Sequence, residues 1–522
     1  MEGEFAHKQI IIDKMKNIIL GNKVSIKDVV NVSRYNYCVE FSEEYINRVN
    51  KCRKYVDKFS KEGQAIYGIT TGLGDNCNKF INENDREIVQ RNTILSHACS
   101  VGEPLEKECV RAMMFVMLVH FGTGYTGIKI ETLNLIKNLL NNDVTPFVPR
   151  HGSVGYLCLE AHIGEVLIGE GKVYYKNELL CSKEVYQKLN LMPISLSSKE
   201  GLTIVSGTTS VTAITSLALY DAISIAKISD ISGSLTLEVL KGTLMAMDDR
   251  LMQVRPHEDQ RYTADNIRNI LSDSEIIEKY KGSKVQDALS IRCMPQLHGA
   301  VKKIIKDCLK TLEIELNSSV DNPLIFDGDN NDGIALMGCN ADGSYVGMSA
   351  DTLAIAITNL SKMSERRIDR LVNRHVSDLP AFLNKEPGLN NGLMIVQYSA
   401  AGILGEMRIA SHPATIDNIT TCANQEDYVS MGYNAALKSY ECVGLSKYIF
   451  AIELICAAQA LDFYDDLKPS SATKKVYDTI RQIVPFIATD VSLHPFIEDV
   501  AVLIKNEKIV DCVEQIIGKL HF

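Results

Sequence analysis

Residues 210–245 read SVTAITSLALYDAISIAKISDISGSLTLEVLKGTLM, and this stretch decides the fold class. Its apolar side chains recur at helical spacing on nearly every side, with Ala, Ser and Thr between them. A helix that is apolar all round needs other helices around it, including those of a neighbouring subunit. The stretch therefore predicts the central helix of a bundle.

Further segments show the same helical spacing of apolar residues, with few Gly or Pro inside: 286–317, 348–372, 391–411 and 434–463. Together they predict a mainly α fold, built on a bundle of long central helices. Along the chain we expect an N-terminal domain at 1–205, a central bundle at 206–470 that forms the oligomer core, and a C-terminal helical segment at 471–522. The loops in which Gly, Asn and Asp gather are the places to seek function: 67–78, 149–156, 320–345 and 385–392.

Composition limits the classes of partner. The chain has 522 residues, is 46% hydrophobic and carries 55 basic against 65 acidic side chains, for a net charge of -10. It can bury a large core, and its scattered basic residues make nucleic acid a poor partner. Residues 1–17 lack the apolar run of a signal peptide, and no run of about 18 apolar residues passes without a charge. We expect a cytoplasmic protein with no membrane partner.

The 14 cysteines form no Cys-x-x-Cys pair, and several stand in apolar helical stretches, such as Cys109, Cys308 and Cys456. Buried free thiols in a reducing compartment are the expectation. No metal is expected either. The acidic loop Asp327–Asp332 lacks the length and the final Glu of a calcium loop, and no His-x-x-x-His pair is present.

Five stretches match, in order and spacing, those of the histidine and aromatic amino acid ammonia-lyase family: Tyr67-Gly-Ile-Thr-Thr-Gly-Leu-Gly74, Gln90-Arg-Asn-Thr-Ile-Leu-Ser-His-Ala98, Val285-Gln-Asp-Ala-Leu-Ser-Ile-Arg-Cys-Met-Pro-Gln296, Val320-Asp-Asn-Pro-Leu324 and Asn424-Gln-Glu-Asp-Tyr-Val-Ser-Met-Gly432. The chain resembles that family over about residues 60–465. The resemblance implies the histidine/phenylalanine ammonia-lyase fold. It also implies a homotetramer assembled by the central helices, with active sites built from more than one chain.

One family feature is missing. Family members carry Ala-Ser-Gly after Gly-Ser-Val-Gly, and that triplet cyclises into an electrophilic methylidene-imidazolone ring. Here Gly152-Ser-Val-Gly155 runs straight into Tyr156-Leu157, while Val166-Leu-Ile-Gly-Glu-Gly171 resumes the family pattern. We therefore expect no cofactor.

Other departures gather around the same place. The family has Asn where this chain has Ser206, Tyr where it has Leu289, and Phe where it has Ala341. Each change could be drift if taken alone. Their clustering around the position of the electrophile indicates a pocket rebuilt for another group.

Residues that a catalyst needs are retained. Tyr67 matches the family's base, with packing at a subunit interface as the alternative. Arg292 matches the residue that binds the substrate carboxylate, unless it makes a structural ion pair. Glu426 matches the position that contacts the imidazole in histidine-specific relatives, where phenylalanine-specific ones carry Gln. It favours an imidazole-like substrate over a solvated surface carboxylate.

Lys385, in the loop before another matching stretch, is a third candidate catalytic residue. With Glu426 it would hold the substrate ring, and the alternative is a solvent-facing lysine. The residues expected to line and bind the substrate, besides Arg292, are His97, Gln286, Ser206, Asn322 and Tyr156.

The missing electrophile has a chemical consequence. The ammonium of an ordinary amino acid has a pKa of about 8 and tyrosine of about 10, so a tyrosinate would deprotonate nitrogen before carbon. The neutral amine is then a very poor leaving group, which the electrophile corrects. A quaternary nitrogen stays cationic at every pH and leaves as neutral trimethylamine, so it needs no electrophile.

These features resemble the ergothionase branch of the family, the trimethylammonia-lyases that split ergothioneine into trimethylamine and thiolurocanate. Three alternatives stay open: a lyase acting on hercynine, a histidine ammonia-lyase-like enzyme, and a non-catalytic relative that binds a ligand or partner. Retention of Tyr67, Arg292 and Glu426 together argues against the last.

Overall fold

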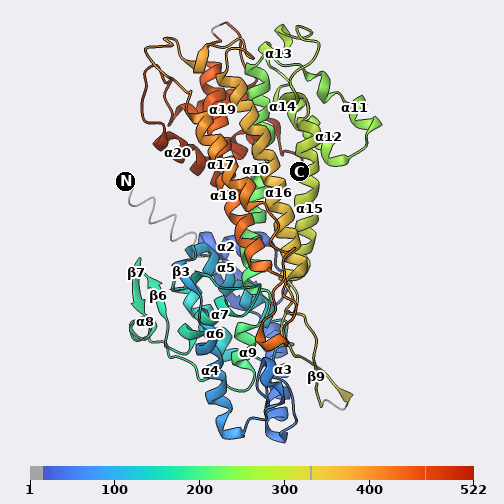
Figure 1. The fold of residues 1–522 in the computed structure, drawn as a ribbon, viewed down its shortest axis with the longest axis vertical. Helices are drawn as coiled ribbons and strands as arrows, with labels where there is room; N and C mark the ends of the chain where they lie inside the picture. The colour runs from blue at the N-terminus through green and yellow to red at the C-terminus, as the bar shows by residue number, and fades with distance from the viewer. Residues whose placement is uncertain (1–15, 330–331, 465) are drawn as a thin grey trace. The chain divides into compact units, whose positions relative to one another are not determined.

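The computed structural model describes residues 16–329, 332–464 and 466–522 (Figure 1). It contains two compact units, each assembled from separate parts of the chain. Unit 1 comprises Met1–Leu217, Leu309–Ala350 and Ala414–Leu437, and unit 2 comprises Ala218–Cys308, Asp351–Pro413 and Lys438–Phe522. The division into 1–205, 206–470 and 471–522 stays a prediction. Residues 1–15, which include most of the stretch inspected for a signal peptide, lie outside the described residues, as do Asn330 and Asn331 of the acidic loop.

Four long helices contribute residues to both units: α10 (Thr209–Val239), α15 (Met294–Leu316), α16 (Ser344–Val372) and α18 (Gly432–Leu461). The other helices of unit 2 are η3 (Leu244–Met247), α11 (Asp249–Val254), α12 (Glu258–Ile270), α13 (Glu275–Lys279), α14 (Leu289–Arg292), η5 (Ala381–Leu383), α17 (Val396–Ala410), α19 (Ser471–Arg481), α20 (His494–Lys505) and α21 (Lys508–Ile517).

Unit 1 contains shorter helices and all the described strands. Its helices are α2 (Ile26–Tyr35), α3 (Glu43–Glu62), η1 (Gly74–Asn78), η2 (Glu83–Asp85), α4 (Arg86–His97), α5 (Lys107–Phe121), α6 (Ile130–Asn141), α7 (Cys158–Leu167), α8 (Ser182–Leu189), α9 (Glu200–Val205) and η6 (Cys422–Asn424). Its strands are β1 (Asn17–Leu20), β2 (Cys38–Phe41), β3 (Val101–Pro104), β4 (Thr145–Pro146), β5 (Pro149–His151), β6 (Lys172–Tyr175), β7 (Glu178–Cys181), β8 (Leu324–Phe326) and β9 (Ile334–Leu336).

The strands form small separate sheets. β1 pairs with β2 in parallel, while β3 with β5 and β8 with β9 are antiparallel pairs. A three-stranded sheet has the order β4-β6-β7. The predicted mainly α fold class is confirmed.

Helix α10 is the central helix that residues 210–245 predict. Its side chains are almost all buried, and several of its small hydroxyls bond within the helix: Oγ of Ser216, for example, donates to the carbonyl of Thr212 at 2.7 Å. The helix ends at Val239 rather than at 245, because Lys241 adopts a left-handed φ of 53° and Gly242 follows it. Likewise α15 begins at Met294, with Pro295 in its first turn, where a proline costs no helical hydrogen bond.

Buried ion pairs join the long helices within unit 2. Glu453 on α18 accepts hydrogen bonds from Nε and Nη2 of Arg367 on α16, at 2.5 and 2.9 Å, and from the hydroxyl of Ser232 on α10 at 3.0 Å. Asp230 on α10 forms an ion pair with Lys302 on α15 at 2.6 Å and accepts a hydrogen bond from Nδ1 of His298 at 2.8 Å. Because removing one partner would strand a buried charge, these pairs fix which helices meet.

One helical stretch in the described residues, Glu200–Val239, is long and apolar enough to cross a membrane by length and composition alone. The whole of its most apolar window is buried inside the protein, as expected for a core helix. The cytoplasmic location itself stays a prediction.

All 14 cysteines are free thiols. Cys109, Cys308 and Cys456 are buried, as the sequence predicts, whereas Cys99, Cys181, Cys339 and Cys422 are exposed. The expectation of buried thiols therefore holds for only part of the set.

Candidate active site

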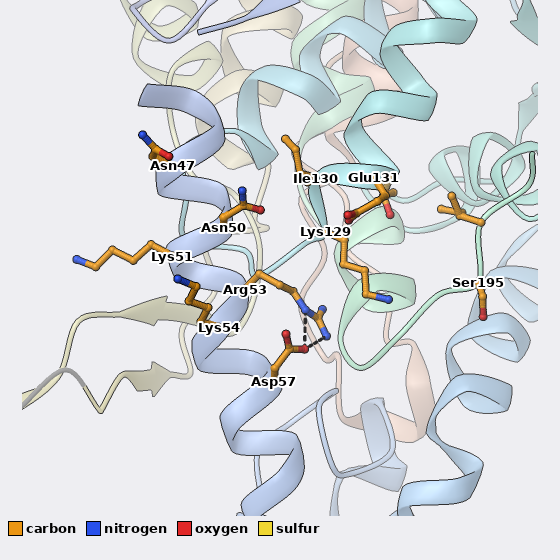
Figure 2. A pocket seen from close by; sticks show the side chains of 12 residues that line it. Asn47, Asn50, Lys51, Arg53, Lys54, Asp57, Lys129, Ile130, Glu131 and Ser195 are labelled. Carbon is orange, nitrogen blue, oxygen red and sulfur yellow. Dashed lines mark hydrogen bonds and ion pairs between the residues drawn. The ribbon is translucent and has the colours of Figure 1, made fainter. Parts of the chain in front are cut away.

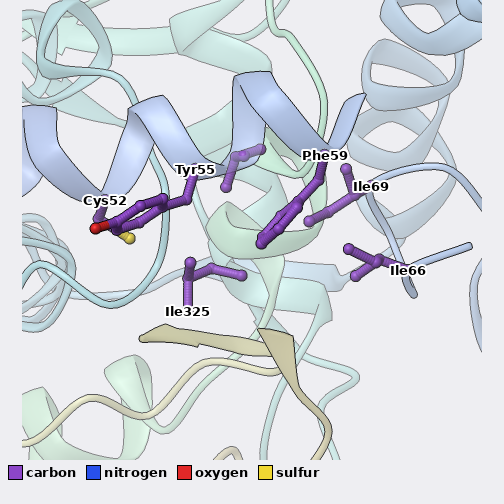
Figure 3. Close-up of a cluster of buried hydrophobic side chains, with 7 residues drawn as sticks. Cys52, Tyr55, Phe59, Ile66, Ile69 and Ile325 are labelled. Atoms are coloured by element: carbon purple, nitrogen blue, oxygen red, sulfur yellow. The ribbon is translucent and has the colours of Figure 1, made fainter. Parts of the chain in front are cut away.

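The loop that carries Tyr67 is anchored by apolar packing on both sides of the tyrosine. Ile66 and Ile69 are buried in a cluster with Cys52, Tyr55, Val56 and Phe59 of α3 and with Ile325 of β8. Figure 3 shows these side chains meeting between helix and strand. The cluster holds the backbone on either side of Tyr67, which leaves the half-buried phenol in a defined position.

The phenol of Tyr67 is held at its oxygen. The backbone N–H of Gly74 donates to Oη of Tyr67 at 2.8 Å. Gly74 adopts a φ of 57°, and a Cβ there would lie 2.3 Å from Sγ of Cys422, so the turn requires glycine. Burial raises the pKa of Tyr67 above 10 and the nearby Glu426 raises it further, whereas the Gly74 hydrogen bond lowers it.

Glu426 stands at the end of a tight turn that begins at Thr421. The two residues exchange backbone hydrogen bonds of 2.8 and 3.3 Å, and Oγ1 of Thr421 donates to Oε2 of Glu426 at 3.2 Å. Residues Cys422, Ala423 and Asn424 have φ values of 50–70°, so the middle of the turn is left-handed. Oε1 of Glu426 makes no hydrogen bond within the described part of the chain, which leaves it to a ligand.

Tyr156 comes directly after Gly155, at the point where the family's triplet is missing. Its hydroxyl donates to Oε2 of Glu426 at 3.1 Å, across 270 residues of sequence. The loop turns sharply here: Gly155 has a φ of 136°, Leu157 has a φ of 83°, and a Cβ on Gly155 would lie 2.6 Å from Oγ of Ser430. Burial and the Glu426 carboxylate both raise the pKa of Tyr156, so it stays a protonated donor.

His97 ends helix α4 and belongs to the same surroundings. Its Nδ1 lies 2.7 Å from the carbonyl of Thr93, which can only accept, so Nδ1 carries the proton and Nε2 is an acceptor. Burial lowers the pKa of His97, while Thr93 and Glu426 oppose that shift. His97 is therefore a neutral, helix-anchored residue, in line with a lining role.

Ser206 and Asn322 lie on two segments of unit 1 that touch each other. Ser206 is buried at the end of α9, and a Cβ on the next residue, Gly207, would lie 2.9 Å from Val320. Oδ1 of Asn322 accepts from the N–H of Gly338 at 2.9 Å, so part of this amide is used inside the protein.

Arg292 and Gln286 lie in unit 2. Arg292 ends the short helix α14, and its Nε is buried without a hydrogen-bond partner among the described residues. Gln286 is exposed, and the buried carboxylate of Asp287 beside it accepts from the N–H of Thr243 at 2.7 Å. This agrees with a carboxylate-binding role but is not specific to Arg292, because Nε of Arg86, Nε of Arg481 and Nη1 of Arg367 are also buried without a partner among the described residues.

Lys385, also in unit 2, is exposed, and its Nζ lies 5.1 Å from the ring centroid of Phe486. The preceding Asn384 is buried, and its Oδ1 accepts from the N–H of Glu386 at 2.7 Å. The loop is thus fixed at Asn384, while the ammonium of Lys385 rests on an aromatic face.

The structure therefore brings Tyr67, Tyr156, His97 and Glu426 together in unit 1, and Ser206 and Asn322 lie on touching segments of the same unit. The reasoning from sequence did not find Thr421, which orients Glu426. A threonine five residues before a glutamate carries no spacing signal, because the contact depends on the left-handed turn between them.

The residues present do not fit the family's electrophilic ring. Loop 152–157 has no Ala-Ser-Gly, and its backbone is closed by its own hydrogen bonds: Oγ of Ser153 donates to the carbonyl of Tyr156, and the N–H of Gly155 donates to Oγ of Ser153, both at 3.1 Å. Instead, the hydroxyl of Tyr156 in this loop donates a hydrogen bond to Glu426. No chemical step is therefore assigned to such a ring.

A separate cavity of about 780 Å³ lies in unit 1 between α3 and the start of α6, and the residues that line it include none of the predicted site residues. Figure 2 shows its side chains, with Arg53 bonded to Asp57. Lys51 also pairs, with Asp327 at 2.5 Å. Among the described residues, no group of three or more His, Cys, Asp or Glu is placed to hold a metal ion.

Comparison with known proteins decides the family. The pattern of the aromatic amino acid lyases matches residues 24–482. The chain belongs to the aromatic amino acid lyase family. This member is 42% identical over 505 residues to a histidine ammonia-lyase from Alkaliphilus oremlandii. The aligned region covers 96% of this chain and 99% of the relative. The prediction of a carbon–nitrogen lyase is confirmed at this level.

Solved structures of two family members are similar throughout. Histidine ammonia-lyase from Trypanosoma cruzi has a TM-score of 0.89 at 33% identity, covering 96% of this chain and 95% of that one. Ergothionase from Treponema denticola, an ergothioneine-degrading enzyme solved with desmethyl-ergothioneine sulfonic acid, has a TM-score of 0.87 at 28% identity, covering 95% and 100%.

Proposed function

We propose that this lyase eliminates trimethylamine from the betaine of an imidazole amino acid, with ergothioneine as the substrate and thiolurocanate as the second product. One observation carries the proposal: where an ammonia-lyase needs Ala-Ser-Gly, this chain has a closed loop followed by Tyr156, whose hydroxyl is bonded to Glu426. The names of the relatives at about 42% identity favour histidine ammonia-lyase, and the loop is the reason for departing from them.

The chemistry is a β-elimination in which every atom is accounted for. The phenolate of Tyr67 takes the proton from Cβ, and the C–H electron pair becomes the Cα=Cβ double bond. The Cα–N bond breaks, its electrons stay on nitrogen, and trimethylamine leaves uncharged. No further electrophile is needed because the nitrogen carries its positive charge from the start.

Tyr67 must be ionised to act as the base, and its raised pKa opposes that ionisation. The N–H of Gly74 stabilises the phenolate, and a quaternary ammonium brought close to it would lower the pKa further, because an opposite charge favours the ionised form. The substrate thus helps to create its own base. A substrate with a neutral amine would not.

Glu426 holds the ring of the substrate. Oε2 is fixed by the hydroxyls of Tyr156 and Thr421, and Oε1 is left to accept an imidazole N–H. Arg292 supplies the donors for the carboxylate, and Lys385 assists at the ring. We also propose a homotetramer in which residues of more than one chain complete each site.

A second candidate is a histidine ammonia-lyase-like activity, which the names of the relatives favour. The deciding experiment supplies ergothioneine, hercynine and histidine to the purified enzyme, and measures trimethylamine and ammonia separately. Trimethylamine from ergothioneine supports the proposal. Trimethylamine from hercynine alone changes the substrate, and ammonia from histidine at a comparable rate overturns the proposal.

A further inference from the structure

Two cysteine thiols face each other beside the candidate site in unit 1. Sγ of Cys99 lies 3.9 Å from Sγ of Cys158, although 59 residues separate them in sequence. Cys99 is exposed and Cys158 is partly buried. The thiol of Cys99 is therefore accessible to a reagent in solution, and the thiol of Cys158 is less accessible.

Each cysteine follows closely on a residue of the site. The N–H of Cys99 donates to the carbonyl of His97 at 2.8 Å, and the N–H of Cys158 donates to the carbonyl of Tyr156 at 3.3 Å. Any displacement of the two sulfurs is thus passed to the backbone that carries His97 and Tyr156. The elimination chemistry uses neither thiol.

Neither cysteine lies in the interior of a helix or strand. Cys99 lies in an irregular segment between α4 and β3, and Cys158 is the first residue of α7, directly after Leu157 with its φ of 83°. A disulfide needs the sulfurs at about 2.05 Å, so they must approach by about 2 Å. Side-chain rotation supplies part of this approach, and movement of the two backbone segments supplies the rest.

We propose that Cys99 and Cys158 form a reversible disulfide by exchange with a low-molecular-weight disulfide such as oxidised glutathione. The thiolate of Cys99 attacks one sulfur of the small disulfide, which gives a mixed disulfide and releases one small thiolate. The thiolate of Cys158 then attacks Sγ of Cys99 and releases the second. Two protein thiols are oxidised, one small disulfide is reduced to two thiols, and the protein's two protons pass to the released thiolates.

The order of attack follows from accessibility. Burial and the neighbouring Cys99 thiol raise the pKa of Cys158 to about 12, so Cys158 is a poor first nucleophile. It becomes effective once Cys99 holds the oxidant next to it, because the second attack is intramolecular.

The cross-link would slow turnover. It draws the segment of Tyr156 towards that of His97, and the 3.1 Å hydrogen bond between Tyr156 and Glu426 depends on the placement of the same loop. The formation of the disulfide does not depend on the proposed function. Its effect on rate does rest on it.

Peptide mapping tests the disulfide. The full chain is equilibrated with oxidised glutathione, free thiols are blocked by alkylation, and the digest is analysed by mass spectrometry. We expect one joined pair of peptides containing Cys99 and Cys158, lost again after reduction. Cys158→Ser should hold glutathione on Cys99, Cys99→Ser should form neither product, and the exposed control Cys181→Ser should behave as wild type.

Absence of the joined peptides in wild type, or equal yields of Cys99 joined to other cysteines, overturns the proposal. In the activity arm, oxidised wild type should release trimethylamine about tenfold more slowly and recover with a thiol reductant, while Cys158→Ser shows no loss that depends on the cross-link. A full rate in cross-linked protein contradicts the effect on turnover. If the reduced enzyme turns over none of ergothioneine, hercynine and histidine, the proposed function is contradicted. The peptide-mapping result for the disulfide does not depend on that outcome.

Discussion

The phenol of Tyr67 and the carboxylate of Glu426 are held by hydrogen bonds inside unit 1, whereas Nε of Arg292 in unit 2 is buried without a partner among the described residues. The difference separates two tasks. A base and a ring-holding carboxylate must be oriented before the substrate arrives. A guanidinium that binds a carboxylate is satisfied only by its ligand.

The largest effect is expected at the pre-oriented base. Tyr67→Phe removes only the phenolic oxygen, so substrate binding should stay nearly intact while kcat falls about 100-fold or more, equal to about 2.7 kcal/mol of barrier. Tyr55→Phe is the matched control: the ring stays in the apolar cluster that anchors the loop, the change removes only the hydrogen bond of its hydroxyl to Oδ1 of Asp327, and kcat should stay near wild type. If Tyr67→Phe kept more than about a tenth of the rate, Tyr67 would not be the base.

Glu426→Gln should lower kcat by about tenfold to thirtyfold and change substrate affinity less, because the carboxylate that accepts the ring N–H orients Cβ towards the phenolate of Tyr67. Tyr156→Phe should do the same more weakly. The two changes share the 3.1 Å hydrogen bond, so the double variant should be less damaged than the sum of both effects. Steady-state kinetics on the four proteins measure this, and strict additivity would mean that the bond has no part in turnover.

The sequence predicts the fold well because the apolar pattern repeats over long segments. It places α10 correctly but extends it to 245, because the apolar spacing continues past Lys241 and Gly242 and does not show the left-handed φ of Lys241. The site is predicted less completely. Glu426 and Tyr156 are both expected in it, yet their hydrogen bond spans 270 residues and no periodicity relates two such distant loops. The Cys99–Cys158 contact is missed for the same reason.

Arg292→Lys tests whether the guanidinium of Arg292 binds the substrate carboxylate. Lysine keeps the charge but loses the planar pair of donors, so KM for the carboxylate-bearing substrate should rise about tenfold with a smaller change in kcat. The fully buried ion pair of Arg367 with Glu453 offers a structural comparison, because Arg367→Lys should lower thermal stability instead. Unchanged KM and kcat in Arg292→Lys would demote Arg292 to a structural role.

The pH dependence of kcat/KM tests the electrostatic coupling between Tyr67 and Glu426 in unit 1. Tyr67 acts as a base only when ionised, and its pKa is raised above 10 by burial and by Glu426, so kcat/KM should still rise with pH at pH 9. Glu426→Gln removes a negative charge and should move this rise to lower pH. Because a quaternary nitrogen has no proton to lose, the substrate adds no step in this range. A rise that stays at the same pH in Glu426→Gln would contradict the coupling.

The smallest and least constrained effect concerns Lys385. Its ammonium rests 5.1 Å from the ring centroid of Phe486, an arrangement that needs no substrate. If Lys385 assists the substrate ring, Lys385→Met should lower kcat by roughly threefold to tenfold with little change in affinity, and combination with Glu426→Gln should cost less than the two effects summed. Phe486→Leu is the control, since it removes the aromatic face and leaves the ammonium free to turn elsewhere. Should Lys385→Met show wild-type kcat, the lysine belongs to the surface and Glu426 acts on the ring alone. Should Phe486→Leu lower kcat as much as Lys385→Met, the aromatic contact is what aims the lysine, and unit 2 then holds a pre-oriented group of its own.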